Sequence, residues 1–350
     1  MQLVRQKGKL GAYRVRAALA ALIVAAVGSG CATEGAQVAA PAKSPSSSQT
    51  ESPAGQKAAR GPQAQKEGAK EGAKEGVREG AKARPKEGGK KGAKEGSAAG
   101  ANSAYAEKVK RAQKARAAAA KKWGLKRTPL PAPLPPAEKP EITTRKGFEV
   151  KGGDDLPPVF TTVPTKEKVV FLTIDDGAEK DPELLRMMSD LQIPYSAFLT
   201  DYVIDDDYGY FEKMQDRGVA LHNHTLSHPY LPGLSYSAQK REICGQQDKL
   251  EKRYGKRPRL LRPPYGNYNR NTLRVAKKCG IEAVPLWAAE AFPDHMEWRE
   301  WDRNLHPGDI ILTHFRGKNE WKGSMPDMVR RVVDIVTRKG YAVAKLEDYV

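Results

Sequence analysis

The chain is poor in core-forming residues: of its 350 residues only 7% are aromatic, while Gly and Pro number 32 and 25. This composition favours one folded domain with a long unfolded part, although the length would suffice for two domains. Residues 151–350 have no net charge, because they hold 30 basic and 30 acidic residues. The net charge of +18 comes from residues 1–150, with 30 basic and 12 acidic residues. This distribution argues against a nucleic-acid-binding surface in the second half.

A long apolar run is missing at the N-terminus as well. The uncharged apolar run of residues 17–27 has eleven residues, which is too short for a helix to cross the hydrocarbon core of about 30 Å. Several Lys and Arg residues precede it, and small residues follow it. This pattern predicts an export signal over residues 1–30.

The signal ends in the small residues of Gly28-Ser29-Gly30, directly before Cys31. This ending resembles the lipobox of bacterial lipoproteins. The resemblance implies that Cys31 is lipidated and anchors the exported protein to the outer face of the cell membrane. The lipobox usually has a larger aliphatic residue at the position of Gly28, so ordinary signal cleavage with secretion is the alternative.

Cysteine is scarce, with three residues in the chain. If Cys31 is lipidated, Cys244 and Cys279 remain. Export to an oxidising compartment makes this pair a disulfide candidate. Two buried free thiols are the alternative, because sequence alone does not give their separation.

Residues 31–150 are predicted to be a disordered, low-complexity linker. Residues 66–82 repeat a Lys-Glu-Gly-Ala unit, and a Gly in every turn costs a helix about 1 kcal/mol relative to Ala. Residues 104–126 favour a transient helix, and residues 128–140 form a Pro-rich stalk. The catalytic domain is predicted over residues 160–350.

From Lys168 onward, short apolar runs alternate with amphipathic segments, which is typical of parallel strands joined by helices. Strands are expected in residues 169–174, 195–200, 219–224, 259–264, 281–287, 309–314 and 341–346. Helices are expected in residues 182–191, 237–254, 271–278 and 325–339. The predicted fold is α/β, a distorted (β/α) barrel of about seven parallel strands, because some 185 residues are too few for a full eight-unit barrel of about 250.

Polar residues gather at the carboxyl ends of these predicted strands. They are Asp175, Asp176, His222, His224, Arg262 and His314. The carboxyl ends of parallel strands meet at one rim, so these side chains are expected to face a common cleft. All six His residues lie between His222 and His314, which favours a functional site.

Each motif has a structural alternative when it is taken singly. His224 and His228 are four residues apart, so on one side of a helical turn both can reach one metal ion, but such a pair is often structural. The Asp-Asp-Gly sequence at Asp175 also suits a turn with a helix cap. Arg262 begins a segment that suits a rigid turn, and His314 suits a core histidine.

Together the motifs resemble the polysaccharide deacetylase family, the NodB-homology domain of carbohydrate esterase family four. The matching segments, in chain order, are 173–177, 224–228, 262–266 and 312–314. The resemblance implies that the metal ligands are Asp176, His224 and His228. It implies that Asp175 is the general base and His314 the general acid.

The same resemblance implies roles for the surrounding residues. Arg262 would fix and tune Asp175, and the backbone N–H of Tyr265 would help to bind the oxyanion. Trp287 would form a wall of the pocket. The chain departs from the family after Trp287, where Glu290 replaces the expected Asp that orients Arg262.

The donor set has a chemical meaning of its own. One carboxylate and two imidazoles leave open positions on a divalent ion, as catalytic sites require, and they suit Zn best, with Co or Ni as alternatives. Such an ion activates water and polarises an acetamide carbonyl. The predicted activity is hydrolysis of N-acetyl groups of amino sugars in a cell-surface polysaccharide, peptidoglycan first, by a monomer.

Two other hypotheses for the function stay open. An O-acetyl esterase acting on xylan-type glycans would use the same residues. A catalytically weakened glycan-binding lipoprotein would explain the altered segment around Glu290. Among the remaining motifs, Trp298 and Trp301 are expected to pack on the sheet, with stacking on sugars as the alternative. Residues 205–207, three Asp, are expected to form a solvated loop rather than a second metal site.

Overall fold

The computed structural model describes residues 95–350, with side chains from residue 106 onward. The predicted export signal, Cys31 and the Lys-Glu-Gly-Ala repeats lie outside the described residues. Within residues 95–350, no helix has the length and apolar character needed to cross a membrane.

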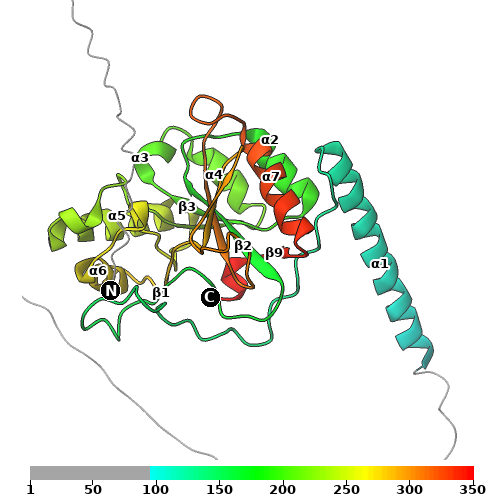
Figure 1. Ribbon diagram of the computed structural model, residues 1–350, viewed down its shortest axis with the longest axis horizontal. Coiled ribbons are helices and arrows are strands. Elements are labelled where there is room, and N and C mark those ends of the chain that lie inside the picture. The colour runs from blue at the N-terminus through cyan, green and yellow to red at the C-terminus, as the bar shows by residue number, and fades with distance from the viewer. Residues whose placement is uncertain (1–94) are drawn as a thin grey trace, which may run out of the picture. The chain divides into compact units, whose positions relative to one another are not determined.

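A mostly parallel sheet forms the centre of the fold (Figure 1). Its middle strand, β2 (Val169–Asp176), is buried along its whole length, as expected for an apolar run that is covered on both faces. The strand order is β4-β3-β2-β8-β6-β7, and β9 also pairs with β2. The other strands are β3 (Ser196–Leu199), β4 (Ala220–Asn223), β6 (Ala289–Ala291), β7 (Met296–Trp298), β8 (Ile310–His314) and β9 (Ala342–Ala344).

Beyond β4 the sheet curves toward closure. Single parallel bridges continue from Asn223 to Leu261 and from Leu260 to Ala283. Next to them, β1 (Val159–Phe160) and β5 (Val284–Pro285) form a short parallel pair. An antiparallel bridge links the residues after β1 to Asp309, directly before β8. This arrangement confirms the predicted distorted α/β barrel.

Two strand predictions need correction. Residues 259–264 form only single bridges at Leu260 and Leu261, because Pro263 and Pro264 have no N–H to donate to a neighbouring strand. The short strands β1, β6 and β7 were not predicted, and β7 runs antiparallel to β6. The barrel is therefore not parallel throughout.

Helices flank the sheet, and the four predicted ones are confirmed to within one residue at each end. They are α2 (Pro182–Leu191), α5 (Tyr236–Tyr254), α6 (Arg270–Lys278) and α7 (Met325–Arg338). The sequence did not predict α3 (Asp201–Ile204), α4 (Tyr208–Gln215) or the 3-10 turns η1 (Leu231–Gly233), η2 (Pro264–Gly266) and η3 (Leu346–Asp348). Side-chain caps start several of these helices; Ser324 and Asn269, for example, form capping boxes on α7 and α6, which satisfies N–H groups at the helix start.

The folded part begins earlier than the predicted boundary at residue 160. Helix α1 (Glu95–Lys122) ends beside α2 (Figure 1). There Ala119 and Ala120 are buried in the core, and the indole N–H of Trp123 donates to Asp190 at 2.8 Å. Residues of the predicted linker therefore belong to the folded unit.

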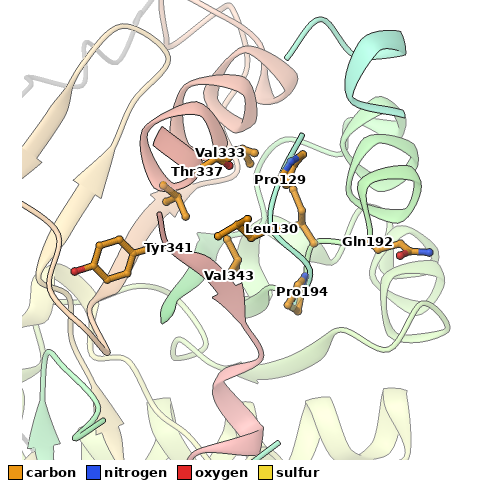
Figure 2. Close-up of a pocket in the computed structure, with 10 residues that line it drawn as sticks. Pro129, Leu130, Gln192, Pro194, Val333, Thr337, Tyr341 and Val343 are labelled. Atoms are coloured by element: carbon orange, nitrogen blue, oxygen red, sulfur yellow. The ribbon is translucent and has the colours of Figure 1, made fainter. Parts of the chain in front are cut away.

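The Pro-rich segment after α1 also packs on the domain. Figure 2 shows Pro129 and Leu130 against residues of α7 and β9, such as Val333 and Val343. The space left between them is about 10 Å³, which is no more than one water molecule needs. Further along, Lys139 donates to the backbone carbonyl of Val350 at 2.6 Å. The segment is thus a strap on the barrel rather than a free stalk.

Cys244 on α5 and Cys279 at the end of α6 form a disulfide, with their Cα atoms 5.2 Å apart. The sulfurs lie in a cluster of apolar residues that α5 and α6 share. Of the two alternatives that the sequence left open, the structure therefore has the disulfide.

We expect the Cys244→Ala/Cys279→Ala double variant to lose about 3–4 kcal/mol of unfolding free energy, because the bond closes a loop of 35 residues. Its catalytic constants are expected to stay at the wild-type level, since the pair lies outside the candidate site. Urea unfolding of the oxidised protein and the variant measures the difference. Equal midpoints and slopes would contradict a structural role for the bond.

Candidate metal centre

The central strand ends in two acidic residues, Asp175 and Asp176, which are both buried. Successive side chains of a strand normally point to opposite faces. Here Asp176 has a φ of 79° and Gly177 a φ of 102°, so the chain turns at the end of the strand. As a result both carboxylates lie near one imidazole, with Asp175 Oδ2 at 3.8 Å and Asp176 Oδ1 at 3.4 Å from His224 Nε2.

The turn requires glycine at position 177 for two reasons. Its φ of 102° is strained for any L-residue, and a Cβ atom there would clash with Ile204 and lie 2.9 Å from Phe211 Cζ. Gly218 offers a control, because it has a φ of 83° but no atom lies within 4 Å of the position that a Cβ would take.

We expect Gly177→Ala to lower the unfolding free energy by about 1–3 kcal/mol more than Gly218→Ala does, because only the first adds overpacking to the backbone strain. It is also expected to lower kcat, since the two carboxylates that precede it must shift. Chemical denaturation and steady-state kinetics measure the two effects. Equal stability losses in both variants would refute this explanation of the turn.

The loop after β4 brings His228 to the same place. It is not the helical turn that the spacing suggested, because Thr225 and His228 have φ values of 72° and 57°. Two local hydrogen bonds hold its shape: the N–H of Thr225 donates to Asn223 Oδ1 at 2.8 Å, and the N–H of His228 donates to Thr225 Oγ1 at 3.1 Å. The rings of His224 and His228 lie 4.9 Å apart.

Asp176, His224 and His228 form the one group of potential metal ligands found in residues 95–350. Asp176 Oδ1 lies 3.4 Å from each of the two Nε2 atoms. A tetrahedral ion with bonds of about 2.0–2.2 Å has its ligand atoms about 3.3–3.6 Å apart. Asp176 Oδ1 is also buried without a hydrogen-bond partner. The residues therefore fit a divalent metal ion.

The groups around these ligands orient them. The backbone carbonyl of Arg262 accepts from His224 Nδ1 at 2.7 Å, which leaves the Nε2 lone pair for an ion. Arg316 donates to Asp176 Oδ2 at 2.6 Å, so that Oδ1 points toward the two imidazoles. Arg316 belongs to none of the sequence motifs; its position two residues after His314 is the one signal in the sequence that indicates it.

Burial and charge set the protonation of the ligands. Burial, with the neighbouring charge of His224, lowers the pKa of His228 to about 4, so its ring is neutral at pH 7. Burial opposes charge on His224 and on Asp176. The charges of Asp175 and Asp176 outweigh it and raise the pKa of His224, and the contact with His224 and the charges of the neighbouring histidines lower the pKa of Asp176.

Asp175 is held by a buried cation. Arg262 is fully buried, and its Nη1 donates to Asp175 Oδ1 at 2.7 Å and to Thr173 Oγ1 at 2.8 Å. Its Nε donates to the carbonyl of Pro285 at 2.9 Å. The guanidinium therefore fixes Asp175 with Oδ2 toward the cation site. The predicted proximity of Arg262 and Asp175 is confirmed.

His314 lies at the end of β8, opposite Asp175 in the β2–β8 pairing. Glu290 on β6 lies beside it, with Oε1 3.4 Å from His314 Nδ1. Burial raises the pKa of Glu290, although the charge of His314 opposes the shift. Glu290 was expected to orient Arg262, but its carboxylate pairs with His314 instead. Glu290 therefore contacts His314, the residue predicted to be the general acid.

Tyr265 and Trp287 border the site on one side. Tyr265 lies in η2 with a φ of 61°, and its ring lies 4.7 Å from that of His228. Trp287 lies close to Gly266, the residue after Tyr265, and would contact a Cβ atom placed there at 3.0 Å. Both residues therefore lie near the metal ligands or Arg262, with Trp287 6.0 Å from the Arg262 guanidinium, and their roles stay predictions.

Other residues selected from the sequence lie elsewhere. His222 belongs to β4, but its Nε2 lies 2.7 Å from Glu347 Oε1, away from the metal ligands. In the run of three Asp, Asp206 pairs with Lys180 at 2.5 Å and Asp207 caps α4. Trp298 packs against the core, as expected. The same prediction is wrong for Trp301, which is 93% exposed, because no element of the core covers it.

These features define a class: an α/β barrel whose strand ends hold a two-histidine, one-aspartate cation site between a carboxylate and an imidazole, as in metal-dependent hydrolases. A family model for polysaccharide deacetylases matches residues 162–284. This chain belongs to the polysaccharide deacetylase family. The matched segment contains the three potential metal ligands, Asp175 and Arg262, and it ends before Glu290 and His314.

Several curated relatives match the same domain. An uncharacterised protein of Streptomyces coelicolor is 38% identical over 216 residues, which cover 61% of this chain and 86% of the relative. The peptidoglycan-N-acetylmuramic acid deacetylase PdaA of Bacillus subtilis is 26% identical over 53% of this chain and 72% of its own length. A peptidoglycan-N-acetylglucosamine deacetylase of Bacillus cereus is 24% identical over 53% of this chain and 90% of its own length.

Proposed function

We propose that this protein is a metal-dependent deacetylase that hydrolyses N-acetyl groups of amino sugars in peptidoglycan. The observation that carries the proposal is that Asp175 and His314 flank the three potential metal ligands at one end of the barrel. The substrate class is supported by the names of two relatives. One is a peptidoglycan-N-acetylmuramic acid deacetylase and the other a peptidoglycan-N-acetylglucosamine deacetylase. The two names differ in the sugar, so the proposal covers both.

We propose zinc as the ion, because one carboxylate and two imidazoles with open positions are typical of catalytic zinc sites. When bound, such an ion lowers the pKa of water and polarises a carbonyl oxygen. The ligands would be Asp176, His224 and His228.

The chain's own residues supply the proton transfers. Asp175 Oδ2 takes the proton of the attacking water, while Arg262 holds Oδ1 in place. The backbone N–H of Tyr265 donates to the oxyanion that develops on the acetyl group. His314 protonates the departing amine, and Glu290 beside Nδ1 orients its ring. Without that proton the amine is a very poor leaving group.

The cellular setting is a proposal from the sequence. Residues 1–30 would direct export, and lipidation of Cys31 would anchor the protein to the outer face of the cell membrane. Residues 32–94 would then give the domain reach toward the cell wall. A secreted form is the alternative.

The test is to incubate the full chain with purified peptidoglycan and Zn, and to measure acetate and free amine together. We expect equal amounts of both, loss of both with a chelator, and little acetate from acetylxylan. Acetate from acetylxylan without amine from peptidoglycan would indicate an O-acetyl esterase instead. Binding to peptidoglycan without any turnover would indicate a glycan-binding protein.

A further inference from the structure

A second cavity lies at the other end of the barrel. Its volume is about 490 Å³, within the range of about 300–1,000 Å³ that is usual for ligand sites. Asp309, which precedes the first residue of β8, lines it, whereas His314 is the last residue of the same strand. At 3.3 Å per residue, the two positions are about 16 Å apart along the strand. The cavity is therefore separate from the metal centre.

Trp301 lines this cavity and is 93% exposed. An indole ring normally contributes much of its surface to packing, as that of Trp298 does three residues earlier. Among the large apolar side chains that the structure describes as exposed, that of Trp301 has the largest exposed fraction. Its position at the mouth of a cavity offers a flat apolar surface to a ligand.

Polar groups of both kinds line the same cavity, and an ion pair and a hydrogen bond connect four of them. Arg145 pairs with Glu300 at 2.5 Å, and His306 pairs with Asp302 at 3.0 Å. The cavity therefore has N–H donors and carboxylate acceptors that are fixed before any ligand arrives.

A pyranose ring matches this combination. Its C–H faces are apolar and pack on an aromatic plane, while the hydroxyl groups at its edge need both donors and acceptors. A membrane surface matches it less well, because the cavity has three carboxylates, Glu300, Asp302 and Asp309, against Arg145 and His306. Anionic lipids attract clusters of Lys and Arg instead.

We propose that this cavity, the Trp301 pocket, is a second glycan-binding site, which holds a stretch of polysaccharide away from the bond that is hydrolysed. The choice of a cell-wall glycan as the ligand rests on the proposed function. A disaccharide in the metal centre does not reach the pocket, because the two sites are about 16 Å apart along β8. The pocket therefore serves polymeric substrate only.

The experiment measures cosedimentation of the full chain with purified peptidoglycan, with a chelator present so that no acetyl group is removed. Trp301→Ala is expected to weaken binding about tenfold, and Trp301→Phe less, because Phe keeps an aromatic face. Leu134→Ala is the matched control, since Leu134 is an exposed apolar residue outside the pocket. All variants keep the same basic N-terminal segment, so its contribution cancels.

Two further measurements complete the test. Turnover of soluble chitobiose with Zn is expected to be equal in wild type and Trp301→Ala. The inference would be overturned if Trp301→Ala bound peptidoglycan as tightly as the wild type does. It would also be overturned if the variant kept its binding to peptidoglycan and lost binding to phosphatidylglycerol vesicles. If the wild type binds peptidoglycan through Trp301 but releases no acetate from it, the proposed function is wrong and the assignment of the Trp301 pocket as a glycan-binding site remains valid.

Discussion

Replacing Asp175 by Asn is expected to lower kcat for acetate release by about 10²- to 10⁴-fold, while the protein still binds Zn. Asn has the same shape and accepts the hydrogen bond from Arg262, but it cannot take a proton from water. His314→Ala is expected to give the same pattern, since the leaving amine loses its proton donor. Steady-state kinetics and isothermal titration with Zn measure the two properties separately.

A control is needed because Arg262 is fully buried, and a buried charge that loses its partner destabilises a protein by about 3–5 kcal/mol. Asp201→Asn is the matched variant. Asp201 is also buried and pairs with a lysine, Lys249, but it lies outside the metal centre. We expect it to cost stability and to keep kcat. Wild-type kcat in folded Asp175→Asn and His314→Ala would show that the proposed mechanism is wrong.

Replacing His228 by Ala is expected to abolish both zinc binding and turnover. Loss of a group that only orients a metal ligand lowers metal affinity by about 10- to 100-fold. Loss of the ligand itself is expected to lower zinc affinity by more than this. The remaining pair, Asp176 and His224, would hold an ion too weakly at micromolar zinc. Titration with Zn and acetate release at rising zinc concentrations measure the effect.

His222→Gln is the control for the His228 variant. His222 lies two residues before His224, yet its ring pairs with Glu347 instead of the metal centre. The change leaves a buried carboxylate with a weaker partner, so we expect a loss of about 1–3 kcal/mol in stability and unchanged zinc affinity. Equal zinc affinity in His228→Ala and His222→Gln would contradict the assignment of the ligands.

The sequence predicted those parts of the site that depend on local pattern. Buried apolar runs identified β2 and β8, and parallel strands bring their ends together, so Asp175 and His314 were expected to be neighbours. The metal ligands and the contact between Arg262 and Asp175 followed from the family resemblance. All of these side chains lie at one end of the barrel in the structure.

The parts that the sequence could not predict depend on tertiary contacts or on backbone angles. A spacing of four suits a helix, and nothing in the sequence shows that Thr225 and His228 adopt positive φ. Glu290 lies beside His314 because β6 pairs with β8 and places Glu290 opposite Leu312, two residues before His314. The sequence did not predict β6, which has three residues. The early start of the folded part depends on a few apolar residues, such as Trp123, within a segment of low complexity.

The most direct measurement of the central claim is the anomalous scattering of a zinc-soaked crystal at the zinc edge. We expect one strong peak, about 2.0–2.2 Å from Asp176 Oδ1 and from the Nε2 atoms of His224 and His228, with Asp175 Oδ2 beside it. A peak bound by other residues, or no peak within reach of these three atoms at saturating zinc, would contradict the claim.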